Sequence, residues 1–561
     1  MFAFEATPFE SRNANSSVKF VGSNTCATCH RTIYNEFRKT SMGRSFGEVS
    51  PHLKSLLPAR AEIDSRSPGH AYQVYWQRDR LYQSESFVDD NGARGIGTQF
   101  PAEYIIGSGA NGYTFLFRRG DRLFEAPLSY YSRTRSWDLS PGFDAYDAGF
   151  TRPVRIACLE CHIGRFATVN KTGNDFATPH IEEQAIGCEN CHGPGELHVR
   201  ERSAAKPPAS PDDSIINPAR LSNALASDLC VRCHQGNDAR VLRPGKRLDD
   251  FRPGTPLTNT LYIFKVPLQR DQKVEQSDLL EHGFAMMLSK CYLQSKSLTC
   301  TTCHSVHRQV APAEKITYYR SKCLNCHSVA SCGLDVSKRQ PDDCISCHMP
   351  KRPVATVAHT ALTNHRIVRS PDAAFFDAAY TDSAGAPGLI NVTAGVDSEK
   401  EPVPELVLLQ AYRALVPEAP WLRDKYISLL DRARSHTPDN PTVLAADGHE
   451  LLISGSASEA RQAIPLLEKA LQARQFDSDV CLDLADALSK EQRLDQAEAI
   501  LKLGLTHDPY EPKLYKALIA LTLKAEKFDE SARAMREYLR LYPADKRVRT
   551  LLNEINNMTG N

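Results

Sequence analysis

The octapeptide CTTCHSVH, residues 300–307, contains the pattern that decides the fold. Its first five residues form C-x-x-C-H, in which two cysteines can attach a haem through thioether bonds while the adjoining histidine binds the haem iron. His307 follows His304 by three residues, so both side chains leave the same side of a helical turn. Because the two axial ligands of one haem approach from opposite faces, we predict that His307 binds the iron of a different haem.

Six further C-x-x-C-H units occur along the chain, and the seven units together use 14 of the 17 cysteines. They predict seven covalently bound haem c groups, each carrying iron. Zinc fits the pattern less well, because structural zinc sites need paired C-x-x-C knuckles or a distant H-x-x-x-H, and seven units cannot be paired. The predicted attachment residues are Cys26, Cys29, Cys158, Cys161, Cys188, Cys191, Cys230, Cys233, Cys300, Cys303, Cys323, Cys326, Cys344 and Cys347. The predicted iron ligands within the units are His30, His162, His192, His234, His304, His327 and His348.

Each low-spin haem c needs a second, distal axial ligand besides the histidine of its own unit. Six histidines outside the units have positions that suit this role, and they are His180, His198, His282, His307, His359 and His365. The first haem has no obvious histidine partner, and three alternatives remain for it: Met42, His70, or an iron that is open or bound by another ligand. A thioether ligand from Met42 would raise the reduction potential of that haem relative to bis-histidine haems.

Residues 71–132 contain no attachment unit and show a period-two pattern of β-branched and aromatic residues, as in YQVYW and GYTFLF. Turn sequences such as DDNG and RRGD separate these stretches, so we predict a small β-rich insert. The stretch GSGANG, residues 107–112, matches G-x-G-x-x-G, but the strand-like YTFLF follows it at once. A dinucleotide site needs a helix at that place, so we interpret these glycines as a turn.

Six units share residues 158–348, roughly 32 residues per haem, which is too little chain to bury a protein core of its own. We therefore expect the porphyrins to form most of the core, with short helices and loops around them. One such loop is the polar linker SAAKPPASPDDS, residues 203–214. Cys291 and Cys332 lie in the same region and could form a disulfide outside the cytoplasm, whereas Cys481 belongs to the apolar face of a later helix.

From residue 404 onward the pattern is helical and repeats with a period of 34 residues. Ala463, Ala497 and Ser531 recur at this spacing, as do Pro509 and Pro543. The period, the small residue in mid-repeat and the proline at its end indicate tetratricopeptide repeats, with an irregular helical bundle as the alternative. Such repeats stack into a curved α-solenoid whose concave face commonly binds a peptide or another protein.

These observations predict a mainly α fold with two large parts. The first is a haem-packed, seven-haem domain at residues 26–366, which contains the β-rich insert at about 71–132 and follows an N-terminal segment, residues 1–25. A linker at residues 367–403 leads to the tetratricopeptide solenoid at residues 404–561.

The motifs resemble those of multihaem cytochromes c that carry a C-terminal tetratricopeptide array. The similar stretches are VGSNTCATCH, RIACLECH, GCENCHGPGELH, HGFAMMLSKCYLQSKSLTCTTCHSVH and CISCHMPKR with HTALTNHRI, and the resemblance covers nearly the whole chain. It implies that His198, His307, His359 and His365 are distal ligands of neighbouring haems. It also implies electron transfer along closely packed, mostly bis-histidine haems, with the repeats docking a redox partner protein or another copy of the chain. Such a head-to-tail contact need not close and could build a conductive filament.

Two other functions fit less well. A multihaem reductase or oxidase of nitrogen compounds needs one haem with an open coordination site, but no C-x-x-C-K unit occurs here and distal candidates suffice for every haem. A scaffold with purely structural haem is the third alternative. The formal net charge of +1 argues against a nucleic-acid binder, and no apolar run is long enough to span a bilayer.

Localisation follows from the cofactor. Haem c is attached outside the cytoplasm, so we expect an exported protein, periplasmic or extracellular. The opening MFAFEATPFESRNANSS has neither a basic n-region nor an apolar h-region, so a signal peptide is not visible in this numbering.

Overall fold

The structure of the chain is a computed structural model. It describes residues 11–88, 92, 94–120, 122–144, 147–154, 156–167, 180–206, 212–236, 238–269, 282–295, 297–339, 341–354, 357–370, 373–375, 377–393, 402–453, 455–473, 477–543 and 545–559. The first ten residues of the expected N-terminal segment lie outside these ranges. Within the ranges, a search by length and hydropathy finds no helix suited to crossing a membrane.

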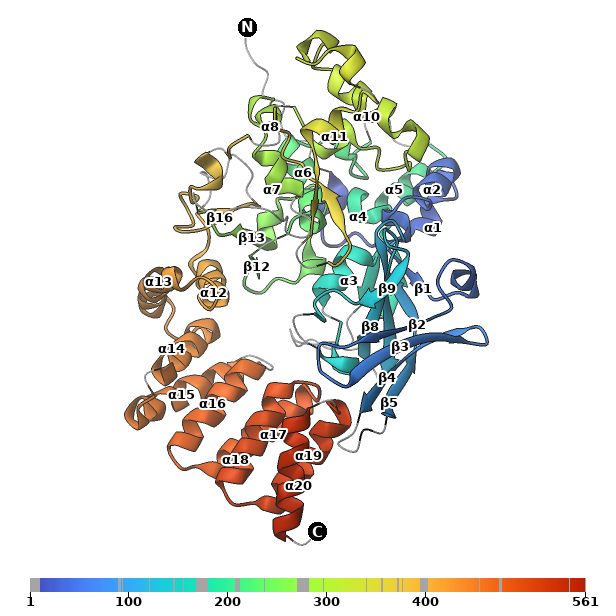
Figure 1. The fold of residues 1–561 in the computed structure, drawn as a ribbon. Helices are drawn as coiled ribbons and strands as arrows, with labels where there is room; N and C mark the ends of the chain where they lie inside the picture. Colours follow the sequence, from blue (N-terminus) through green and yellow to red (C-terminus); the bar gives the residue numbers. More distant parts are fainter. Residues whose placement is uncertain are drawn as a thin grey trace.

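Two antiparallel sheets form a β-rich insert in the N-terminal part of the chain (Figure 1). One sheet has the order β1-β6-β7-β8-β9 and the other the order β2-β3-β4-β5. Buried side chains from both sheets share one core, among them Tyr72 and Leu81 from the second sheet and Phe115, Phe124 and Leu128 from the first. The strands extend beyond the expected range: β1 (Phe46–Glu48), β2 (Arg60–Asp64), β3 (His70–Gln77), β4 (Arg80–Val88), β5 (Arg94–Pro101), β6 (Tyr104–Ile106), β7 (Gly112–Arg119), β8 (Arg122–Tyr131) and β9 (Ser136–Leu139).

The glycine-rich stretch at residues 107–112 joins β6 to β7, which pair as an antiparallel hairpin. Gly107 has φ 104° and Gly109 has φ 80°, a backbone region that side-chain-bearing residues rarely adopt. A Cβ at Gly107 would also lie 2.7 Å from the carbonyl oxygen of Gly112. The glycines are therefore required by the turn, and a strand rather than a helix follows them.

Short helices carry or flank the attachment units through the first two thirds of the chain. They are α1 (Ser23–Cys26), α2 (Arg31–Phe37), α3 (Ile156–His162), α4 (Glu189–His192), α5 (Glu196–Arg202), α6 (Asn223–His234), α7 (His282–Met287), α8 (Lys290–Gln294), α9 (Cys300–Cys303), α10 (Lys315–Leu324) and α11 (Cys344–His348). Three small antiparallel sheets accompany them: β10 (Arg165–Ala167) with β11 (His180–Glu183), β12 (Ala239–Leu242) with β13 (Leu261–Lys265) and β16 (Ile390–Asn391), and β14 (Lys351–Pro353) with β15 (Ala361–Thr363).

Ordinary protein packing is sparse around the last three units. Among the described side chains of residues 297–348, Val310 alone is buried. Helices α9, α10 and α11 bury none of their own described residues. Helices this short do not hold together in water without an apolar partner, so another apolar body is needed to organise this region.

Among the described residues after 404, nine helices form the tetratricopeptide part, each packed on its successor (Figure 1). The repeating small residues Ala463, Ala497 and Ser531 are fully buried where helices approach closely. The packing at Gly448 is equally close, because a Cβ there would lie 2.5 Å from Leu467 Cγ. The helices are α12 (Glu405–Leu415), α13 (Arg423–His436), α14 (Pro441–Ile453), α15 (Ala457–Ala473), α16 (Ser478–Lys490), α17 (Leu494–His507), α18 (Pro512–Lys524), α19 (Phe528–Leu541) and α20 (Lys546–Thr559).

The C-terminal end of the solenoid rests against the chain's own β-rich insert (Figure 1). The Tyr510 ring packs edge-on against Phe124, with 4.7 Å between centroids, and the Arg122 guanidinium lies 5.5 Å from the Tyr510 centroid. Arg122 also donates to the backbone oxygen of His507 at 2.9 Å and pairs with Asp508 at 3.3 Å. At the other end, α12 and β12 share one buried core. The solenoid is thereby tied to the haem-bearing half at both of its ends.

Replacing Arg122 by alanine should weaken this interface by about 1.5–3 kcal/mol, because hydrogen bonds from a charged, largely buried donor are lost. Faster hydrogen–deuterium exchange in β8 and α17 would measure the loss. Arg133, an exposed residue of the same insert, provides the control, and its alanine variant should exchange like the unchanged protein. Equal exchange in both variants would show that the contact contributes nothing.

Candidate haem centres

In the part of the chain that the structure describes, five pairs of histidine rings lie close together across separate elements. Four of these pairs join a histidine of an attachment unit to one of the predicted distal ligands. The pairs, with centroid distances and interplanar angles, are His30 with His198 (6.4 Å, 20°), His192 with His307 (6.0 Å, 10°), His304 with His365 (6.0 Å, 30°) and His234 with His282 (5.8 Å, 88°). Two imidazoles bound on opposite sides of one metal, at about 2 Å per metal–nitrogen bond, have centroids about 6 Å apart. The side chains therefore fit an iron between each pair.

The two histidines of CTTCHSVH face different partners. His304, at the end of its unit, faces His365, whereas His307 faces His192 of the third unit. His365 also lies 4.3 Å from His282, edge to face, so two neighbouring pairs touch. His304 and His307 therefore lie beside histidines of different attachment units, and their binding to different irons stays a prediction.

Several of these rings hold a hydrogen bond through Nδ1. The Nδ1 atoms of three histidines donate to backbone oxygens: His192 to Ile216 at 2.8 Å, His348 to Val368 at 2.7 Å and His365 to Thr363 at 3.0 Å. A protonated Nδ1 leaves the lone pair on Nε2, which is the tautomer and orientation that a metal ligand needs.

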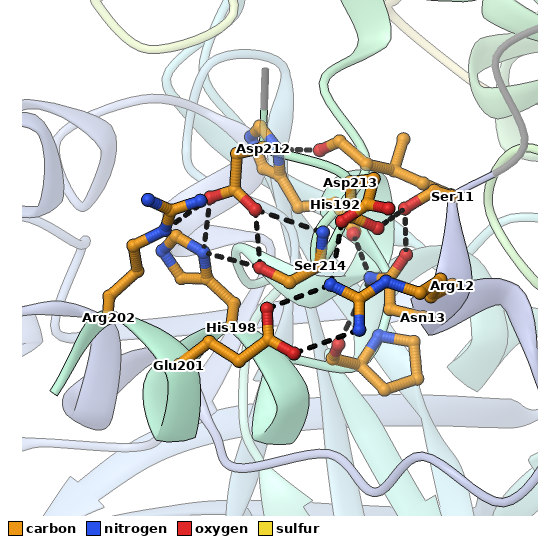
Figure 2. Close-up of polar contacts among 12 residues, drawn as sticks. Ser11, Arg12, Asn13, His192, His198, Glu201, Arg202, Asp212, Asp213 and Ser214 are labelled. Carbon is orange, nitrogen blue, oxygen red and sulfur yellow. Dashed lines mark hydrogen bonds and ion pairs between the residues drawn. The ribbon is translucent and has the colours of Figure 1, made fainter. Parts of the chain in front are cut away.

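Two further histidine rings contact polar side chains through Nδ1. His304 Nδ1 contacts the Tyr319 hydroxyl at 3.3 Å. His198 Nδ1 lies 2.9 Å from Asp212 Oδ2 and 3.3 Å from Ser214 Oγ (Figure 2). Burial would raise the pKa of Asp212, but hydrogen bonds from Arg202 and Ser214 outweigh it and hold that pKa well below its usual range. The acceptor facing His198 is therefore an ionised carboxylate.

The N-terminal segment is bound to the third attachment unit and to the loop that contacts His198. Asn13 is fully buried, and its amide donates to the backbone oxygens of His192 and Pro194 at 2.9 and 3.0 Å. Arg12 forms ion pairs with Glu201 and Asp213 (Figure 2). The segment before the first unit is thus held against the third unit.

Burial favours the neutral form of two of these imidazoles. Burial lowers the pKa of His192, and the neighbouring His307, His30 and His198 lower it further. Burial likewise lowers the pKa of His365 to about 4, with a further contribution from His304. A neutral imidazole is the form that binds a metal, so these rings are ready to act as ligands at neutral pH.

The attachment units also approach one another through their cysteines. Thiols of different units perturb one another's pKa, so the first unit lies close to the third, the second to the fourth, the fourth to the fifth and the sixth to the seventh. The pairs are Cys26 with Cys188, Cys161 with Cys233, Cys230 with Cys300 and Cys323 with Cys344.

His70, one of the three alternatives for the distal ligand of the first haem, lies in different surroundings. Its Nδ1 lies 3.2 Å from Asp147 and its Nε2 lies 3.3 Å from Glu85, inside the β-rich insert. Burial lowers the pKa of His70, but hydrogen bonds to the two carboxylates outweigh this and raise it to about 9. Burial would raise the pKa of Asp147, but hydrogen bonds from His70, Ser65 and Tyr72 lower it to about 2. An imidazolium with both nitrogens protonated has no lone pair for iron, so we do not retain His70 as a ligand.

The remaining candidates occupy other surroundings. Met42 is half-buried in a short 3₁₀ turn, Met42–Arg44, while the ring that faces His30 is His198. His180 begins β11 with an exposed side chain. His359 places its Nε2 2.6 Å from Asp138 and its ring on Tyr131. Among the described residues, no histidine ring stacks on the unit histidines His162, His327 or His348.

Sequence reasoning missed the contribution of the polar linker. Its end supplies Asp212 and Ser214 to His198, and Ile216 just beyond it supplies a carbonyl to His192. The paired aspartates in PPASPDDS were a signal, but a polar stretch between helices is usually only solvated. Cys291 and Cys332 are free thiols, so the expected disulfide is not formed, and Cys481 is fully buried in α16.

Comparisons with known proteins bear on both the part with the attachment units and the helical C-terminal part. The family model described as cytochrome c554 and c-prime matches residues 147–193. The multihaem cytochrome MtrA of Shewanella baltica (strain OS185) is 23% identical over 223 residues, which are 37% of this chain and 57% of that protein. Both matches imply covalently bound haem c. The chain thus spans little more than half the length of this curated relative.

The helical C-terminal part matches a tetratricopeptide repeat model at residues 456–522. Among solved structures, MamA from Desulfovibrio magneticus RS-1 shares 18% identity over 27% of this chain and 85% of its own, with a TM-score of 0.23. A thermophilic tetratricopeptide protein of Thermus thermophilus shares 17% identity over 28% of this chain and 83% of its own, with a TM-score of 0.23. The repeat model and the stacked helices make the C-terminal region a tetratricopeptide-like helical array, and such repeats suggest interaction with other proteins.

Proposed function

We propose that the protein is a c-type cytochrome with seven haems that transfers electrons between other proteins. Four facing histidine pairs, each set for iron, are the observation that carries this proposal. The contacts between attachment units support a continuous row of cofactors rather than isolated sites. The sparse protein core around residues 297–348 supports it too, because porphyrins would supply the apolar body that those helices lack.

Haem c supplies a one-electron iron couple at each site. At four attachment units the chain would hold the iron between two imidazoles. Burial lowers the pKa of two of these histidines, His192 and His365. Cys29 and His30 of the first unit are exposed, as are Cys326 and His327 of the sixth.

The repeats would dock a redox partner protein, or another copy of the chain in a head-to-tail filament, and the protein would work in the periplasm or outside the cell. Docking of another copy predicts polymers in electron micrographs of the purified holoprotein. Discrete particles only would favour a separate redox partner.

Intact mass spectrometry of the exported holoprotein tests the proposal directly. We expect seven haem increments, and replacing Cys300 and Cys303 together by serine should remove one of them. The holoprotein should be reduced and reoxidised rapidly by external donors and acceptors, with low-spin iron in its resting spectrum. A high-spin signal would favour a reductase with an open haem, slow exchange would favour a structural role, and missing increments would refute the proposal.

A further inference from the structure

One short loop, residues 212–216, supports histidines of two attachment sites with acceptors of different charge. His198 Nδ1 lies 2.9 Å from Asp212 Oδ2 and 3.3 Å from Ser214 Oγ (Figure 2). The Ile216 carbonyl oxygen accepts from Nδ1 of His192 at 2.8 Å. One histidine therefore meets a full negative charge and the other a neutral dipole.

The carboxylate of Asp212 is fixed in this orientation. Arg202 Nε donates to Oδ2 at 3.0 Å, and the backbone N–H of Ser214 donates to Oδ1 at 2.9 Å. The Ser214 hydroxyl donates to Oδ1 as well, and Ser214 is fully buried. The neighbouring Asp213 pairs instead with Arg12 at 2.7 Å, so the two adjacent carboxylates have separate partners (Figure 2).

A carboxylate that accepts the second N–H of a metal-bound imidazole makes that imidazole a stronger electron donor. A more basic ligand stabilises ferric over ferrous iron, and hydrogen bonding around the ligands is one means by which proteins set haem potentials. A neutral carbonyl has a smaller effect on the same atom, because its partial charge is lower.

We propose that Asp212 is a positioning residue that lowers the reduction potential of the haem on Cys26 and Cys29 through His198. The assignment follows from His198 facing His30 of that unit. This inference rests on the proposed function. Because the Cys26 and Cys188 thiols are in contact, the electron equilibrium between the first and third haems is shifted toward the third.

The test is a redox titration of full-length holoprotein carrying Asp212→Asn, followed by optical and electron paramagnetic spectra. The reduction equilibrium constant of one haem should rise about tenfold, equivalent to about 59 mV for one electron, and the low-spin signal of the same haem should move. Asp213→Asn is the matched control, since it removes the same charge one residue away without touching His198. The Asp213 variant should shift the reduction potential of that haem by less than half as much. Equal shifts in both variants would overturn the inference.

A second variant keeps the test decisive if Asp212→Asn does not accumulate. Arg202→Gln removes the cation whose Nε lies 3.0 Å from Asp212 Oδ2, so more of the carboxylate's negative charge acts on His198. We expect the reduction potential of the same haem to fall. Arg12→Gln, which removes the equivalent cation beside Asp213, is its control, and an equal or smaller fall in the Arg202 variant would contradict the role of Asp212. Loss of the haems from unsubstituted protein would instead refute the proposed function, whereas a full set of haems with unshifted potentials refutes only this inference.

Discussion

Replacing His198 by alanine should convert one haem per chain from low-spin to high-spin iron. The reason is geometric: the His198 ring faces His30 at 6.4 Å between centroids, nearly parallel to it, and its removal leaves that iron with one protein ligand. The resting electron paramagnetic spectrum should gain a high-spin signal that integrates to one iron. Carbon monoxide should then bind the reduced variant at one site, although the unsubstituted protein offers it none.

A control variant and a Met42 variant test this assignment of His198 to the first haem. His52 lies in an exposed 3₁₀ turn, Pro51–Ser55, and His52→Ala should leave every haem low-spin. Met42→Ala should do the same if His198 is the ligand. A high-spin signal in the Met42 variant together with an unchanged His198 variant would reverse the assignment.

The attachment units and the repeats could be predicted because their signals are local. Two cysteines and a histidine within five residues define a haem site whatever the rest of the chain does. A period of 34 residues is equally visible, because each repeat packs mainly on its neighbours, as Ala463 and Ala497 do. The β-rich insert follows from period-two alternation, although its outer strands β1, β2 and β9 are too short or too polar to stand out.

The pairing of ligands could not be predicted, because it depends on tertiary contacts between distant segments. His30 and His198 lie 168 residues apart in the chain, and nothing local marks them as partners. The role of Asp212 was hidden for the same reason, since a carboxylate in a polar linker acquires meaning only when a ring faces it. Local chemistry therefore predicts which residues can bind haem, whereas the fold decides which two share an iron.

His70 shows how missing tertiary contacts leave a ligand role open that the structure does not support. From the sequence it was an isolated histidine 40 residues after the first unit, and a ligand role was open to it. In the structure its partners are Asp147, far along the chain, and Glu85 on the adjacent strand β4. Lys546 and Arg549 of α20 line the pocket beside it. The cluster is thus a buried ion pair that joins β3 to β4 and to the loop after β9.

This buried ion pair predicts that the β-rich insert loses stability as the pH rises from about 6.5 to about 9. His70 has a folded-state pKa of about 9 against an ordinary value of 6.5, so folding favours its protonated form. The resulting stabilisation is fully present below pH 6.5 and is lost as the pH rises through the folded-state pKa. A shift of this size corresponds to about 3 kcal/mol at most. Hydrogen exchange of β3 and β4, measured across this range, should report the loss.

His70→Gln supplies the comparison that isolates the effect. The variant should be less stable than the unsubstituted protein at pH 6 by about 3 kcal/mol or more, because Glu85 and Asp147 lose their cationic partner inside the insert. Its exchange rates, corrected for intrinsic chemistry, should then change little between pH 6.5 and 9. Matching pH profiles in the two proteins would mean that His70 is not charged in the folded state, and its place as an iron ligand would have to be considered again.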